Sequence, residues 1–220
     1  MLQPQIITVL QDVKTELSLL NIPKEYPTEA VKRGYAARSN ATENDPPSTA
    51  GNNAFSAIVR AIRELFLPEG WERLNKHNLC FTINIETKTA IVVSSGDSNV
   101  GMKDCNIGYP RTKNPKGERY KEIISDNRDM FGFEQKIQSI LFPDFQTFVL
   151  LYYYDRKKGE MRLELSSPIE MDINGFVNGW HKRIIFSPIL FNVQLNPERQ
   201  TELSSVDLQD FDIPVKRRKQ

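Results

Sequence analysis

The chain has 220 residues, of which 39% are hydrophobic and 26% are charged, and its formal net charge is +1. This balance is typical of a soluble globular protein with one domain, and the near-zero charge excludes a whole-molecule field that attracts nucleic acid or a membrane surface. No apolar stretch approaches the roughly 18 residues that a membrane-spanning helix needs, so we expect no membrane segment.

Two helices are predicted in the first third of the chain. Apolar residues recur at helical spacing from residue 3 to residue 20, which is typical of an amphipathic helix. A second helical pattern lies at about 53–67 and is followed by Pro68 and Gly70, which end it. Between the two patterns, the segment 39–53 is rich in Ser, Asn and Pro, which predicts a long polar loop.

A β-hairpin is predicted after the second helix. The segments CFTINIE and TAIVVSS have the composition of strands and flank the dipeptide at 87–88. With that dipeptide as the turn, Ile83 lies opposite Val92 and both face the core. A second long polar loop is expected at 94–117, and a helix at 118–141.

A second hairpin has the clearest pattern in the chain. The segments QTFVLLYYYD and GEMRLELSS flank the polar turn RKKG, which sets Asp155 opposite Glu160. One face of this hairpin is apolar, and the other carries Arg162 and Glu164, so we expect that second face to be at least partly exposed to solvent. A fifth strand is expected at about 181–188.

These elements predict a single α+β domain at 1–191, followed by a polar, flexible tail at 192–220. The sheet is expected to have five strands, two hairpins plus a fifth strand, in a mostly antiparallel arrangement. About four helices are expected to pack on one side of it, because consecutive strands are joined by short turns.

The second half of the 94–117 loop, together with the start of the next helix, is the main candidate binding site. This segment concentrates cations, which suit contacts with a phosphate backbone. One tyrosine precedes the cations and another stands among them, and both suit stacking on bases. The predicted nucleic-acid or ligand-binding residues are Arg111, Lys113, Lys116, Arg119, Lys121, Tyr109 and Tyr120. A protein partner would use the same residues.

An acidic cluster is the alternative site. Pro143-Asp144 and Asp155-x-Lys157 formally match a nuclease spacing, but an extended strand between them would hold the two aspartates apart. In the predicted register, Asp144 instead lies beside Glu170 and Asp172, and three carboxylates there would suit Mg²⁺ or Mn²⁺. This arrangement would make the protein a metal-dependent phosphodiesterase. The leading hypothesis requires no metal or cofactor.

The tail is a candidate partner-binding segment. It interleaves apolar residues with three aspartates and then ends in a run of cations, a composition typical of segments that order on binding. Its predicted partner-binding residues are Leu208, Phe211, Ile213, Lys216, Arg217, Arg218 and Lys219.

Cys80 and Cys105 are the only cysteines, and the N-terminus lacks the pattern of a signal peptide, which together favour a cytoplasmic protein. The chain has no P-loop, dinucleotide fingerprint or hydrolase elbow. We therefore expect a non-enzymatic accessory subunit that engages nucleic acid or a nucleoprotein partner through the basic loop. A further hypothesis, which no motif carries, is that the protein belongs to a multi-component bacterial antiviral defence or mobile-element system. The second alternative is a purely protein-binding subunit or inhibitor that acts through the tail.

Overall fold

The computed structural model describes residues 3–104, 108–130 and 144–191. The helices are α1 (Leu10–Leu19), α2 (Glu25–Ser39), α3 (Thr49–Phe66), the short 3-10 helix η1 (Leu67–Glu69) and α4 (Arg119–Met130). The strands are β1 (Gln5–Ile7), β2 (Glu72–Lys76), β3 (Leu79–Asn84), β4 (Thr89–Ser95), β5 (Gln146–Asp155), β6 (Glu160–Met171), β7 (Val177–Ile185) and β8 (Ile189–Leu190).

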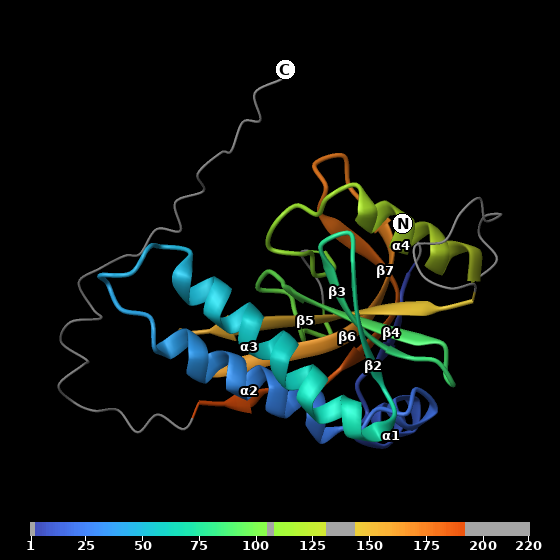
Figure 1. The fold of residues 1–220 in the computed structure, drawn as a ribbon, viewed down its shortest axis with the longest axis horizontal. Helices are drawn as coiled ribbons and strands as arrows, with labels where there is room; N and C mark the ends of the chain where they lie inside the picture. Colours follow the sequence, from blue (N-terminus) through green and yellow to red (C-terminus); the bar gives the residue numbers. More distant parts are fainter. Residues whose placement is uncertain (1–2, 105–107, 131–143, 192–220) are drawn as a thin grey trace.

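The described strands form one eight-stranded sheet in the order β1-β7-β6-β5-β4-β3-β2, with β8 paired to β6 (Figure 1). The β4–β5 and β1–β7 pairs are parallel, and the other pairs are antiparallel. The β4–β5 pair is parallel because the chain leaves the sheet after β4 and returns through α4, as parallel neighbours require. The sheet is therefore mixed.

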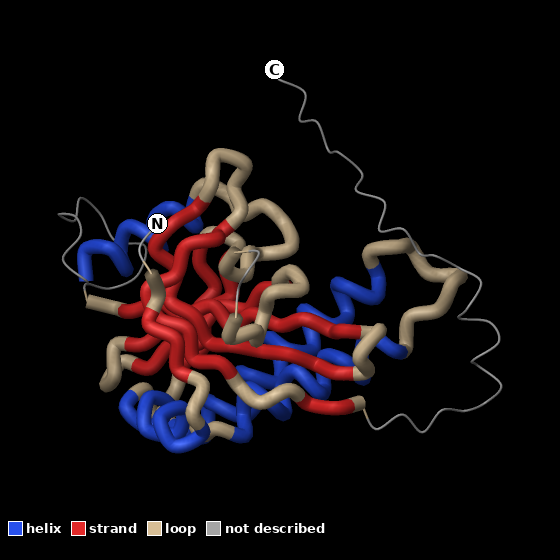
Figure 2. Tube along the Cα trace, turned by 180° about the vertical axis from the view of Figure 1, so that it is seen from behind, coloured by secondary structure: helices blue, strands red, loops and turns tan. Residues whose placement is uncertain are grey.

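Helices cover both faces of this sheet (Figure 2). On one face, α1, α2 and α3 bury an apolar core that includes Ile58, Phe66 and Phe148. On the other face, α4 and the 96–117 loop bury a second core that includes Phe81 and Ile123. None of the helices in the described ranges combines the length and the apolar composition that a membrane-spanning helix needs.

The predicted α+β class with a single sheet is confirmed, but the predicted five-strand, mostly antiparallel sheet with helices on one side is wrong. β1 lies within the segment predicted as one long helix, and its partner β7 is far away in sequence. β2 has the sequence ERLNK, an edge strand with no apolar alternation to reveal it. β8 has only two residues.

The first polar segment is also shorter than predicted. The structure leaves only residues 40–48 between α2 and α3, whereas 39–53 was expected to be a loop. Helix α2 was not predicted, because its sequence is polar and contains Pro27 and Gly34. Gly34 has no side chain, and this allows the backbone of α2 to lie against Ile58 of α3.

The register of the second hairpin is confirmed, with Asp155 opposite Glu160 and Leu150 opposite Leu165. The first hairpin is shifted by two residues from the prediction, because Ile83 lies opposite Ala90 and residues 85–88 form a longer turn. In that turn, the side chain of Asn84 accepts a hydrogen bond from the backbone N–H of Thr87 at 3.0 Å. A shift of two residues preserves which side chains face each core.

The face of β6 that was expected to meet solvent is buried. Glu164 is 0% exposed and Arg162 is 3% exposed. The 96–117 loop covers both side chains. The hairpin pattern gives no indication that a loop covers this face.

Candidate functional site

The 96–117 loop packs on the sheet through buried charged side chains. Arg162 donates a hydrogen bond from Nη1 to the carbonyl oxygen of Ser98 at 3.0 Å. The backbone N–H of Gly101 donates to Oε2 of Glu164 at 2.8 Å. The loop is therefore fixed at several backbone positions and forms part of the fold.

Ion pairs join three of the five predicted cations to neighbouring carboxylates: Arg111 to Asp97 at 3.9 Å, Arg119 to Glu122, and Lys121 to Glu118 at 2.8 Å. These pairs are largely exposed, and pairs of this kind contribute about 0–1 kcal/mol each. The side chain of Lys113 is exposed. The loop and the start of α4 thus present cations whose charge is partly balanced by acidic neighbours.

Tyr120 is not available for base stacking, because it is only 4% exposed and belongs to the core beneath α4. The ammonium group of Lys116 lies over this ring, 5.6 Å from the centroid. Burial lowers the pKa of Lys116 to about 8. Tyr109 is partly buried, and its ring lies 5.9 Å from the guanidinium carbon of Arg183. Tyr120 is therefore part of the second core, and Tyr109 packs against the same core.

Two of the three residues of the predicted acidic cluster, Asp144 and Asp172, accept hydrogen bonds from nearby protein groups. Asp144 accepts a hydrogen bond from Nζ of Lys88 at 3.0 Å. Oδ1 of Asp172 accepts hydrogen bonds from the backbone N–H groups of Asn174 and Phe176, and these bonds close the β6–β7 turn. Glu170 is partly buried near Gly179 on β7. Across the described ranges, no group of three or more His, Cys, Asp or Glu side chains is placed to hold a metal ion.

The predicted partner-binding residues Leu208, Phe211, Ile213, Lys216, Arg217, Arg218 and Lys219 lie outside the described residues.

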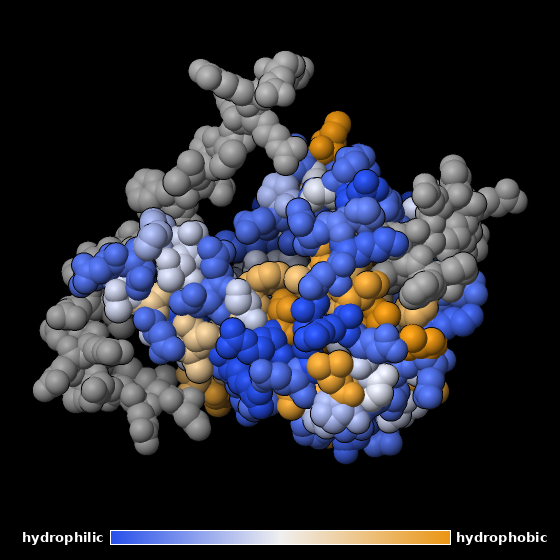
Figure 3. All heavy atoms as spheres, viewed as in Figure 1, coloured by the Kyte–Doolittle hydropathy of each residue, from blue (hydrophilic) through white to orange (hydrophobic). Residues whose placement is uncertain are grey.

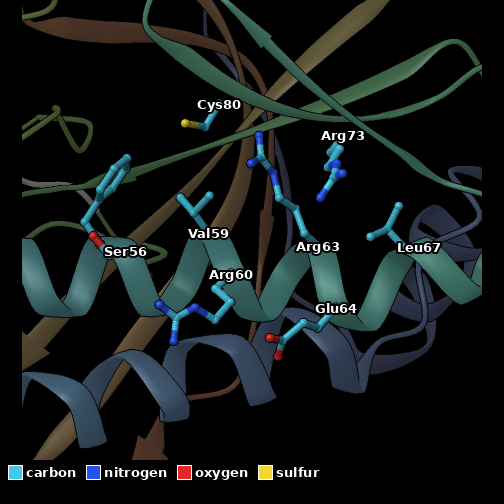
Figure 4. A pocket seen from close by; sticks show the side chains of 9 residues that line it. Ser56, Val59, Arg60, Arg63, Glu64, Leu67, Arg73 and Cys80 are labelled. Carbon is cyan, nitrogen blue, oxygen red and sulfur yellow. The ribbon is translucent and has the colours of Figure 1, made fainter.

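A groove of about 460 Å³ runs along α3 where this helix faces the edge of the sheet (Figure 4). Its lining comes from the exposed side of α3, from Leu67 at the start of η1, and from β2 and β3. The lining residues are Phe55, Ser56, Val59, Arg60, Arg63, Glu64, Leu67, Arg73 and Cys80. The sequence patterns did not predict this site.

Three arginines from two elements belong to the lining of the groove. Figure 4 shows the side chains of Arg63, from α3, and Arg73, from β2, in the space between the helix and the strands, and Arg60 on the side of α3 that faces α2. Arg63 is held in place, because Nη2 donates to Oδ1 of Asn75 at 2.6 Å and to the carbonyl oxygen of Phe81 at 3.3 Å. The Nε atom of Arg63 is buried and has no hydrogen-bond partner within the described part of the chain.

Arg60 and Arg73 are exposed, and neither forms an ion pair with any described residue. The groove has one carboxylate, Glu64, whose Oε2 pairs with Nη1 of Arg33 at 3.2 Å. The charge of the groove is therefore positive and not balanced locally, unlike that of the 96–117 loop.

Apolar side chains also line the groove. Phe55 is 40% exposed and Leu67 is 41% exposed, and the partly buried Val59 lies between them along α3. On the face seen in Figure 3, apolar side chains stand beside strongly hydrophilic ones over α3 and the neighbouring strands. Guanidinium groups around an exposed aromatic ring and aliphatic side chains suit a ligand that carries both negative charge and flat apolar surface.

The arginines were missed because two of them lie on a helix whose apolar face dominates its pattern. Arg60 and Arg63 are spaced i and i+3, so they are neighbours on the surface of α3. Arg73 joins them only through the packing of β2 along α3, which local periodicity does not reveal. The spacing of Arg60 and Arg63 was the one signal available in the sequence.

A comparison of this chain with known protein families, curated proteins and solved structures finds no match. The candidate site therefore rests on the geometry of the chain itself.

Proposed function

We propose that this protein is a non-enzymatic binding module that holds single-stranded nucleic acid in the α3 groove. The observation that carries the proposal is that Arg60, Arg63 and Arg73 all belong to the lining of one groove, which has a single carboxylate, Glu64. Three guanidinium groups suit the phosphates of a nucleic-acid backbone, which they bind through paired hydrogen bonds.

The apolar lining favours single-stranded over double-stranded nucleic acid as the ligand. Unpaired bases expose flat faces that stack on aromatic side chains, at about 1–3 kcal/mol per base. Phe55 offers such a ring at one end of the groove, and Val59 and Leu67 extend the apolar surface along α3. A duplex hides these base faces and would contact the rim alone.

The 96–117 loop is a secondary contact in this proposal. Its exposed cations, Lys113 and Arg111 among them, would add attraction at longer range. Arg111 of the loop pairs with Asp97, and Arg119 and Lys121 at the start of α4 pair with Glu122 and Glu118, so we assign the principal contacts to the groove.

The test is fluorescence anisotropy of a labelled single-stranded oligonucleotide of about 10 nucleotides, a length in the usual range for one binding site. Three phosphate contacts predict that the logarithm of the binding constant falls with the logarithm of salt concentration at a slope of about −2. Reversing two charges in Arg60→Glu/Arg73→Glu should weaken binding by at least tenfold, about 1.4 kcal/mol, and flatten the slope. Binding that is unaffected by this variant would exclude the groove.

A further inference from the structure

We infer that the acidic tail segment 206–213, VDLQDFDI, docks in the α3 groove of the same chain and competes there with external anions. The segment lies outside the described residues. The inference concerns the same groove as the proposed function, but it does not depend on nucleic-acid binding. It rests on charge, on apolar pattern and on reach.

Charge is the first match. The segment carries Asp207, Asp210 and Asp212 and contains no Lys or Arg. The groove presents Arg60 and Arg73 without ion pairs to any described residue, and Arg63 beside them. Arginine pairs with carboxylate through two parallel hydrogen bonds, so three aspartates in a short segment suit three guanidinium groups.

Apolar pattern is the second match. Leu208, Phe211 and Ile213 alternate with the aspartates, so the segment carries both kinds of side chain within a few residues. The groove has the same mixture, because Phe55 and Leu67 line it together with the arginines and remain about two-fifths exposed. A single extended or helical segment would bury the apolar side chains against α3 while its carboxylates meet the rim.

Reach is the third condition, and the described end of the chain meets it. The ring of Phe191 stacks on Tyr35 of α2, with centroids 4.2 Å apart. Arg33, one half-turn earlier on α2, pairs with Glu64 of the groove at 3.2 Å. The linker 192–205 spans up to about 45–50 Å when extended, and α3 is about 27 Å long, so the segment can reach any part of the groove.

Docking of this kind makes the tail a competitor of the external ligand. A tethered segment has an effective concentration in the millimolar range, so even weak docking fills the groove for much of the time. A nucleic-acid ligand would then bind after it displaces the segment. The aspartates take the place of phosphates in the occupied state.

The test uses Cys80, a free and partly exposed cysteine in the groove lining, as a reporter in the full chain. A Leu208→Cys substitution is made in a Cys105→Ser background, and disulfide formation with Cys80 is followed by mass spectrometry under mild oxidation. The matched control carries the same two changes together with Asp207→Asn, Asp210→Asn and Asp212→Asn. This control keeps the linker and the cysteines but removes the charge.

We expect an intramolecular disulfide that forms about tenfold faster in the charged segment than in the control, because docking raises the local concentration of the tail thiol above that of random collisions. Adding Arg60→Glu/Arg73→Glu to the charged version should lower its rate to that of the control. Equal rates with and without the aspartates would overturn the inference. No nucleic acid is present in this experiment, so its failure is separate from a failure of the proposed function.

Discussion

Glu164 and Arg183 form an ion pair that is completely buried between the sheet and the 96–117 loop. Oε2 of Glu164 lies 2.6 Å from Nη2 of Arg183, and both side chains are 0% exposed. The same carboxylate accepts the backbone N–H of Gly101, and the same Nη2 donates to the carbonyl oxygen of Met102 at 3.1 Å. This pair therefore joins β6, β7 and the loop.

Removing one partner of the pair should be strongly destabilising. Arg183→Met leaves the charge of Glu164 buried and uncompensated, which costs about 3–5 kcal/mol in comparable cases. Urea denaturation should show this loss in the free energy of unfolding, and hydrogen exchange should show faster opening of residues 98–102. The matched control is Arg33→Met, which breaks exposed pairs with Glu29 and Glu64 and should cost less than about 1 kcal/mol for each pair.

The double variant Glu164→Met/Arg183→Met should lose less stability than the sum of the two single variants, because no unpaired charge remains. Strict additivity, or an Arg183→Met protein that unfolds at the wild-type urea concentration, would contradict this description of the loop.

Gly34 is required by the close approach of α2 to α3. A Cβ atom at this position would lie 2.3 Å from Cγ1 of Ile58 and 2.8 Å from the hydroxyl oxygen of Tyr154. Gly34→Ala should therefore destabilise the protein by about 1–3 kcal/mol, despite the better helix propensity of alanine. Gly51→Ala on α3 is the control, because nothing lies within 4 Å of its Cβ, and it should be neutral or stabilising. A Gly34→Ala protein as stable as Gly51→Ala would mean that the two helices are not packed this closely.

Lys116 should make the stability of the protein depend on pH in the alkaline range. Burial lowers its pKa from 10.5 to about 8, so the unfolded chain binds more protons than the folded chain between these values. The contribution of Lys116 to the free energy of unfolding therefore rises with pH across that window. Below pH 8 the folded protein carries the full cost of burying the charged ammonium group. Lys116→Met should raise the melting temperature at pH 7 by about 2–4 °C, the shift that about 1 kcal/mol produces in a chain of this size.

The advantage of Lys116→Met should shrink as the pH rises from 8 towards 10, because the wild-type lysine loses its charge there. Melting curves at three pH values measure this, with Lys103→Met as a control at an exposed loop position. A constant difference between variant and wild type across the range would show that Lys116 keeps an ordinary pKa.

Local sequence pattern predicted those parts of the fold that local contacts determine. The register of the β5–β6 hairpin was predicted to the residue, because alternation and a polar turn specify it. The parallel pairing of β1 with β7 was not predictable from periodicity, since it joins the two ends of the described chain. The burial of Arg162 and Glu164 was missed for the same reason, because a distant loop covers them.

The candidate site was only partly accessible from the sequence. A run of cations in a loop is conspicuous in sequence, but the structure shows that carboxylates of the same region accompany Arg111, Arg119 and Lys121. The groove depends on β2, an edge strand that carries Arg73 and has no strand pattern. Sequence proximity thus favoured the loop, whereas packing of separate elements formed the groove.

The most direct test compares the groove with the loop in one binding assay. Arg60→Glu/Arg73→Glu and Lys113→Glu/Lys121→Glu each replace two exposed cations with two carboxylates, so they change the net charge equally. Binding of the labelled single strand is measured by anisotropy at low salt, after melting curves confirm that both variants fold. We predict that the groove variant loses at least tenfold in affinity, about 1.4 kcal/mol, and that the loop variant loses less than about threefold. A loop variant that loses as much as the groove variant, or a groove variant that binds like the wild type, would contradict the assignment of the site.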